Sequence, residues 1–301
     1  MRVLTPRAVP LGGVRAMTVR RTLPQRGRTL IGAWCFADHY GPDVVSATGG
    51  MDVPPHPHTG LQTVSWLFAG EIEHRDSLGS HALVRPGELN LMTAGNGIAH
   101  SEVSTPGTTT LHGVQLWVAL PEEGRFAARD FAHHVPETVE LDGGSLRVLL
   151  GELAGSASPV RTFTPLLGAE VTLAAGAAVT LDVDPQFEHG VLVDSGPVTV
   201  AGHPVEESEL AYVPPGSTSL TLAGPADRAG RVVLLGGPPF EEQLVMWWNF
   251  VGRSHDEVAA FRESWQAGSA QFGEVLGYRG EVDRLPAPVL PNVRLKPRGN
   301  G

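Results

Sequence analysis

The chain has 301 residues, of which 42% are hydrophobic, and a formal net charge of −10. This length and apolar content predict a folded protein with room for two domains, and they exclude an intrinsically disordered chain. The negative charge repels phosphate backbones, so direct binding to nucleic acid is not expected. The single cysteine, Cys35, excludes an internal disulfide and a cysteine-rich zinc module, and it favours a reducing compartment.

The N-terminal segment, residues 1–28, is rich in arginine and contains no acidic residue. It lacks the continuous apolar core of a signal peptide, so we expect the protein to be cytoplasmic. Cys35 follows in the apolar run LIGAWCF, where a buried and unreactive thiol is expected. The longest apolar stretch, around Val171 to Leu181, is far shorter than the ~20 residues of a membrane helix, so no membrane span is expected.

The first half of the chain has the pattern of short β-strands. Between Thr63 and Phe68, the apolar residues Val64, Trp66 and Phe68 alternate with their neighbours, which is the period of a half-buried strand. The turn sequences RPGE, TAGNG and STPG separate further short runs. Strands this short, separated by Gly and Pro, predict a sandwich or jelly-roll barrel rather than alternating strands and helices. The further runs are Ala82–Val84, Leu89–Met92 and Leu111–Leu120.

The segment PEEGRFAARDFAHHVPETV is charged and bounded by proline, and it is predicted to connect two domains, 1–135 and 136–301. A second series of strands begins at Leu146. One helix is predicted, because Ser254 and Glu257 form a capping box and Gly268 can end the helix. The fold class is therefore all-β, two tandem jelly-roll barrels with a few short helices. The strands expected in the second half include Val171–Val183, Gly190–Val200 and Val232–Leu235.

Two pairs of polar residues stand out in the first half. His56 and His58 are two residues apart, as are His100 and Glu102, and residues at this spacing point to the same face of a strand. If both strands belong to one barrel, four ligands could meet at one metal ion. Three imidazoles and one carboxylate suit Fe, Mn, Co, Ni, Cu or Zn better than calcium or magnesium. A six-coordinate ion would keep two positions open for dioxygen or for an oxygen-donor substrate.

Other histidines give weaker signals. His74 and Asp76, in EIEHRDS, are expected in a solvated hairpin, although they could line the mouth of a pocket. The second half contains His189, His203 and His255, but none forms such a pair. The second domain is therefore predicted to hold no metal and to be structural.

Several long motifs resemble the pirin family of the cupin superfamily. They include HPHTGLQTVSWLFAGEIEHRDSLGS, RPGELNLMTAGNGIAHSE, HGVQLWVALP and LGGPPFEEQLVMWWNFVGRSHDEVAAFRESWQAG. The resemblance spans nearly the entire chain and implies two cupin barrels, with an iron-type centre in the first whose ligands map to His56, His58, His100 and Glu102. Gln62 departs from the glutamate that is common at this position, which puts the local hydrogen bonding in doubt rather than the metal.

The resemblance also implies an activity. Many pirins with intact ligands resemble quercetin 2,3-dioxygenases, which open the central ring of a flavonol with O2, so we expect Fe(2+), a small aromatic oxygen-donor substrate and O2. Glu102 is either the general base that takes the substrate's hydroxyl proton or a plain ligand. Other pirins act as transcriptional co-regulators, so the alternative is a regulatory protein whose metal tunes binding to a protein partner. A different cupin activity on another oxygen-donor substrate also remains open.

Overall fold

The computed structural model describes residues 1–10 and 17–300, so residues 11–16 of the arginine-rich segment, and residue 301, lie outside the description. The chain forms two compact units, each made of several segments. The predicted boundary after residue 135 stays a prediction. Unit 1 consists of Met1–Ala8, Arg20–His39 and His134–Phe240, and unit 2 consists of Val9–Val19, Tyr40–His133 and Glu241–Gly301.

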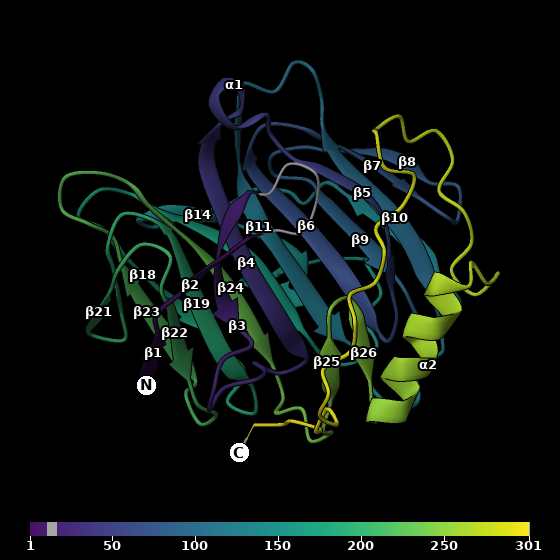
Figure 1. Ribbon diagram of the computed structural model, residues 1–301. Coiled ribbons are helices and arrows are strands. Elements are labelled where there is room, and N and C mark those ends of the chain that lie inside the picture. Colours follow the sequence, from purple (N-terminus) through teal and green to yellow (C-terminus); the bar gives the residue numbers. More distant parts are fainter. Residues whose placement is uncertain (11–16, 301) are drawn as a thin grey trace. The chain divides into compact units, whose positions relative to one another are not determined.

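Unit 1 contains two antiparallel sheets (Figure 1). The seven-stranded sheet has the order β1-β22-β19-β24-β17-β14-β13, and the four-stranded sheet has the order β18-β23-β20-β21. The bounds are β1 Arg2–Leu4, β13 Val139–Leu141, β14 Gly144–Leu150, β17 Leu167–Leu173, β18 Ala178–Asp182, β19 Glu188–Ser195, β20 Val198–Val200, β21 His203–Val205, β22 Leu210–Val213, β23 Ser219–Ala223 and β24 Gly230–Gly237, with a separate small hairpin of β15 Glu152–Leu153 and β16 Ser156–Ala157.

One hydrophobic core cluster of unit 1 is aliphatic. Its buried members are Leu, Val and Ala side chains from both sheets, and the partly buried Phe187 packs against it. The alternation is clear in β18, where Val179 and Leu181 are buried and their neighbours are exposed. Two long strands predicted here were wrong in extent, because each is broken by a glycine in the left-handed region. Gly176 separates β17 from β18, and Gly196 separates β19 from β20.

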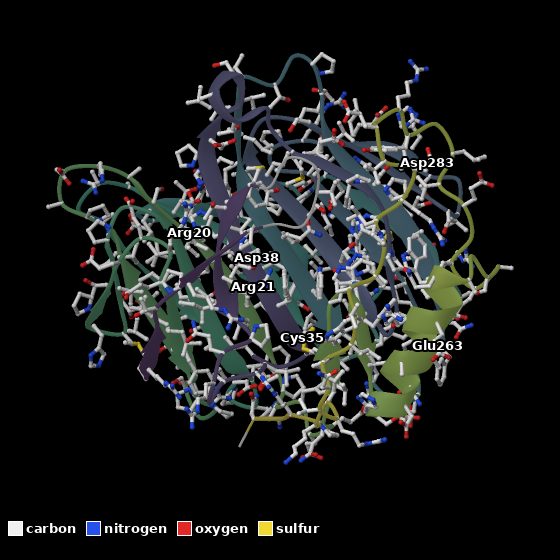
Figure 2. The ribbon with its side chains drawn as sticks, in the orientation of Figure 1. Arg20, Arg21, Cys35, Asp38, Glu263 and Asp283 are labelled. Carbon is white, nitrogen blue, oxygen red and sulfur yellow. The ribbon has the colours of Figure 1, made fainter. Side chains whose placement is uncertain are left out.

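Strands β3 (Thr18–Leu23) and β4 (Trp34–Val44) pair antiparallel, and Arg21 lies beside Asp38 within unit 1 (Figure 2). The Arg21 Nε donates to Asp38 Oδ1 at 2.6 Å. Burial raises the pKa of Asp38, and Arg21 opposes this rise. Cys35 is fully buried in β4, as predicted from its apolar surroundings.

Unit 2 is also built on two antiparallel sheets (Figure 1). One has the order β5-β10-β7-β8; the other has the order β12-β9-β6-β11-β4-β3-β2, in which β2 (Arg7–Pro10), β3 and β4 have residues in both units. The strands predicted in the first half are confirmed, but β6 is buried on both faces along most of its length, so the prediction that it is half-buried was wrong. The bounds are α1 Val45–Thr48, β5 Asp52–His58, β6 Leu61–Ala69, β7 Ile72–Asp76, β8 His81–Val84, β9 Leu89–Thr93, β10 Ile98–Ser104, β11 Thr110–Ala119 and β12 Asp130–His134.

Strand β12 was not predicted, because it lies in the charged segment that was taken for a plain connection. Two side chains tie it to unit 2. His133 Nδ1 and Asn90 Oδ1 lie 2.6 Å apart, and the Phe131 ring stacks on His74 with ring centroids 4.8 Å apart. The partners in these contacts are far apart in sequence, so the local pattern of charge and proline could not predict the strand.

After unit 1, the chain returns to unit 2 as the hairpin β25 (Val245–Trp247) and β26 (Phe250–Gly252), followed by α2 (His255–Gln266). The predicted helix is confirmed: Ser254 caps it by accepting a hydrogen bond from the Glu257 backbone N–H. A buried cluster joins α2 and this hairpin to Ala99 of β10. None of the described helices has both the length and the apolar character needed to cross a membrane.

Candidate metal centre

Three neighbouring strands of unit 2 carry pairs of polar residues at the i, i+2 spacing. Strand β10 pairs with β5 on one side, where His100 is opposite His56, and Ile98 is opposite His58. The register shifts between His100 and Glu102, which indicates a bulge in the β5–β10 pairing. Strand β10 thus presents His100 next to the two histidines of β5, whereas Glu102, beyond the register shift, is opposite Val53.

The turn before β10 depends on a glycine. Gly95 has φ +51, and a Cβ atom at this position would lie 1.9 Å from the carbonyl oxygen of Ala127. No side chain fits there, and the backbone conformation also favours glycine. The sequence TAGNG therefore forms the tight turn that leads into His100, as predicted.

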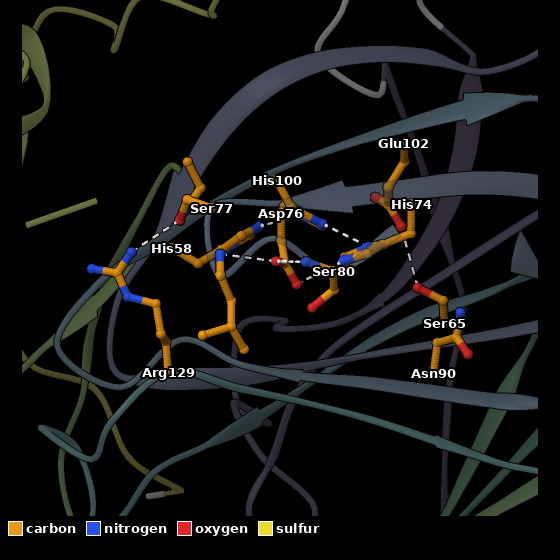
Figure 3. A network of polar contacts seen from close by, with 12 residues as sticks. His58, Ser65, His74, Asp76, Ser77, Ser80, Asn90, His100, Glu102 and Arg129 are labelled. Atoms are coloured by element: carbon orange, nitrogen blue, oxygen red, sulfur yellow. Dashed lines mark hydrogen bonds and ion pairs between the residues drawn. The ribbon is translucent and has the colours of Figure 1, made fainter. Parts of the chain in front are cut away.

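Three of the four predicted ligands converge. Each of His56, His58 and His100 offers a ring nitrogen that lies within 4.8 Å of the other two. All three side chains are buried, with at most 6% of their surface exposed. The Nε2 atoms of His58 and His100 are only 3.1 Å apart (Figure 3). His56 Nδ1 lies 2.9 Å from the carbonyl oxygen of Pro54; donation of its proton there leaves Nε2 with a free lone pair.

This geometry suits a metal ion. Two nitrogens bound to one first-row ion at about 2.1 Å, and at right angles to each other, would lie about 3.0 Å apart. The observed Nε2–Nε2 separation of 3.1 Å is close to that value. Without a shared cation or proton, two lone pairs at this distance would repel each other. The buried histidine cluster is therefore consistent with a metal site.

The electrostatics of the cluster favour neutral rings, which is the form that binds metals. Burial lowers the pKa of His56 to about 4, although the hydrogen bond to Pro54 opposes the shift. Burial also lowers the pKa of His58 and of His100 well below the usual value for histidine, and the neighbouring histidines add to both shifts. The backbone of Asn249 opposes the shift at His58.

Glu102, the fourth predicted ligand, is in a second group of three. Its carboxylate and one ring nitrogen each of His74 and His100 all lie within 4.8 Å of one another. Ser65 Oγ lies 3.2 Å from Glu102 Oε1 and 3.0 Å from Gln115 Oε1, so two acceptors face its one hydroxyl proton. Burial raises the pKa of Glu102, while His74 and Ser65 oppose the rise. The two groups share His100, so Glu102 borders the triad on the side of β7.

His74 and Asp76 of β7 lie in the interior, next to the triad. They are 3% and 2% exposed, so the expectation of a solvated hairpin was wrong. A usable signal was present, because Ile72, His74 and Asp76 alternate in the same i, i+2 pattern as the two predicted pairs. Gln62 is buried and donates to Thr93 Oγ1 at 2.9 Å, so its amide is used in pairing β6 with β9.

The two double-sheet units, one with a buried histidine cluster, define a protein of the two-domain cupin class. The chain belongs to the pirin family. Residues 15–118 match the family model described as Pirin, and residues 168–273 match the model described as the Pirin C-terminal cupin domain.

Similar proteins agree with this assignment. A protein of Pseudomonas aeruginosa named "putative quercetin 2,3-dioxygenase" is 46% identical, over 96% of this chain and 90% of its own length. A crystal structure of quercetin 2,3-dioxygenase from Acinetobacter baumannii superposes with a TM-score of 0.92 at 38% identity, covering 100% of this chain and 98% of that one. A bacterial pirin from Escherichia coli, solved with nickel(II), shares the fold with a TM-score of 0.60 at 18% identity, covering 79% of this chain and 99% of that one.

Proposed function

We propose that this protein is a metal-dependent dioxygenase that cleaves a flavonol such as quercetin, or a related phenol, with O2. The observation that carries the proposal is the convergence of three buried, neutral imidazoles on one point. The names of the 46% and 38% identical relatives support the choice of reaction. The reducing compartment favoured by the single, buried Cys35 leads us to include a cytoplasmic location.

In this proposal the metal ligands are His56, His58, His100 and Glu102, and the ion is Fe(2+). Mn, Co, Ni, Cu and Zn are the other ions that this donor set suits. The three rings supply Nε2 lone pairs, and Glu102 adds a carboxylate from the next inward position of β10. When bound, the metal lowers the pKa of an oxygen donor that binds to it.

Glu102 is also the proposed general base. Ser65 Oγ faces its Oε1, so Oε2 is the oxygen available to a substrate hydroxyl. Because burial raises its pKa, this carboxylate holds a proton more readily than an exposed glutamate does. Most residues of the neighbouring strands β5 and β10 are buried, which limits the access of water to this carboxylate.

The test is an aerobic assay that follows loss of the quercetin absorption band with protein loaded separately with each of the six ions. We expect turnover with at least Fe(2+). Glu102→Gln should keep much of the metal and lose turnover, whereas His203→Ala, at an exposed position in unit 1, should change neither. Full activity of Glu102→Gln would remove the base role. Metal uptake without turnover for any of the six ions would instead favour a regulatory binding protein.

A further inference from the structure

Strand β7 places a third pair of buried polar residues, His74 and Asp76, next to β10. It pairs antiparallel with β10, so that Asp76 is opposite His100, and His74 is opposite Glu102. Both side chains of β7 are buried on the face that the triad occupies (Figure 3). The pair is therefore next to the candidate metal centre but does not belong to the predicted ligand set.

Hydrogen bonds connect this pair to the triad in one continuous chain. Asp76 Oδ1 accepts the backbone N–H groups of Leu78 and Ser80, both at 2.9 Å. The other oxygen, Oδ2, lies 3.2 Å from His74 Nε2. His74 Nδ1 lies 3.4 Å from His100 Nδ1, and His100 Nε2 faces His58 Nε2 at 3.1 Å.

For neutral imidazole rings, the chemistry of each group fixes which atom donates in this series of hydrogen bonds. A carboxylate only accepts hydrogen bonds, so His74 Nε2 carries the proton that it donates to Asp76. A neutral imidazole has one N–H, which leaves His74 Nδ1 as an acceptor. His100 Nδ1 must then be the donor between the two rings, and its Nε2 keeps a free lone pair directed toward His58.

The surroundings hold this arrangement in place. The turn that contributes the Leu78 and Ser80 N–H groups fixes the Asp76 carboxylate, and the stacked Phe131 ring restricts the plane of His74. His56 reaches the same tautomer by a different route, because its Nδ1 lies against the Pro54 carbonyl oxygen. Outer hydrogen bonds of this kind orient metal-bound histidines in general.

We infer that His74 and Asp76 are positioning residues that hold His100 as its Nδ1–H tautomer, so that its Nε2 stays free to bind a metal ion. The functional meaning of this tautomer rests on the proposed metal centre, but the proton positions themselves can be measured in metal-free protein. His74 acts through His100 and is not itself a ligand.

The direct test is ¹⁵N NMR of the histidine rings in metal-free, full-length protein at pH 8. We expect His74 to be protonated at Nε2 and His100 at Nδ1. Protonation of His74 at Nδ1, or of His100 at Nε2, would overturn the inference whether or not the protein is a metalloenzyme.

The functional test is the variant Asp76→Asn, titrated with Co²⁺ alone. The side-chain oxygen of the new asparagine can still accept hydrogen bonds from Leu78 and Ser80, but its NH2 group then faces His74. This donor reverses the direction of the hydrogen bonds from residue 76 through His74 to His100. We expect Co²⁺ affinity to fall about 10–100-fold, the usual cost of losing such an outer partner, and His100 to become protonated at Nε2. The matched control is His81→Asn on β8, whose exposed ring should leave the affinity unchanged.

The outcomes separate this inference from the proposed function. If the wild-type protein binds Co²⁺ and Asp76→Asn binds it equally well, the positioning role is wrong and the metal centre stands. If the wild-type protein binds no Co²⁺, the metal centre fails, and the NMR result alone decides the tautomer chain. His74→Phe, which keeps a ring against Phe131 but offers no acceptor, should also weaken Co²⁺ binding if the inference is correct.

Discussion

The two units have the same kind of architecture but differ in what lies between their sheets. In unit 1, a hydrophobic core cluster has only Leu, Val and Ala among its described buried members, with Phe187 packed against it. In unit 2, three strands of one sheet direct histidines and carboxylates into the interior, and those residues are as well buried as the aliphatic ones. The difference indicates that the fold itself does not require the polar cluster of unit 2, and burial of these polar groups is consistent with a metal site.

The largest effect expected from this comparison is the loss of metal from unit 2. His100→Ala removes the residue that both ligand groups share, so we expect metal affinity to fall by more than the roughly 100-fold that outer-partner changes cause. The measurement is metal content per folded chain by elemental analysis. His203→Ala in unit 1 is the matched control and should retain the wild-type content. Equal metal content in both variants would place the metal elsewhere.

The reciprocal change tests the aliphatic interior of unit 1. Leu234 is fully buried in that cluster, and Leu234→Ala should reduce the free energy of unfolding by about 2–5 kcal/mol. Chemical denaturation of the variant gives this value. Metal affinity of the folded fraction should not change. A loss of metal as large as that of His100→Ala would show that the units are not separable in function.

A smaller effect concerns pH. In metal-free protein, the folded-state pKa of His56 is about 4, below the value of about 6.5 in an unfolded chain. The unfolded state therefore binds more protons between these values, so the contribution of His56 to stability is present above pH 6.5 and is lost as the pH falls toward 4. Urea unfolding between pH 7.5 and 4.5 measures it. The drop should be smaller in His56→Gln, and an identical drop in both proteins would contradict the account.

The smallest effect is expected at Ser65. Its hydroxyl opposes the rise in the pKa of Glu102, so Ser65→Ala should raise that pKa further. The effect is expected to be small because the same hydroxyl also lies 3.0 Å from Gln115 Oε1. The acid limb of the kcat/KM profile should move to higher pH. If the acid limb stays at the same pH in Ser65→Ala, its position is not set by the pKa of Glu102, and Glu102 is not the general base.

Much of the architecture could be predicted because it depends on local pattern. The alternation of apolar residues predicted β6, and the capping box of Ser254 and Glu257 predicted α2. Strand ends were less predictable, because Gly176 and Gly196 interrupt apolar runs that look continuous in sequence. Strand β12 could not be found at all, since its place depends on contacts such as that of His133 with Asn90.

The candidate site also combines features that depend on local sequence pattern with features that depend on contacts between distant residues. The spacing of His56 and His58 could show which way the side chains point, and the structure brings both to His100. The spacing of His74 and Asp76 shows that they share a face, but the burial of His74 could not be predicted, because its sequence neighbours are charged and the ring is covered by Phe131 and β10. Pattern thus identifies residues that share a face, whereas burial requires the complete fold.

The most direct test of the central claim is anomalous diffraction from crystals of the protein loaded with Fe(2+) or Ni(2+), collected at the absorption edge of the metal. We expect one strong peak within about 2.0–2.2 Å of the Nε2 atoms of His56, His58 and His100. A peak on His74 instead, or no peak in unit 2 for protein that contains the metal, would contradict it.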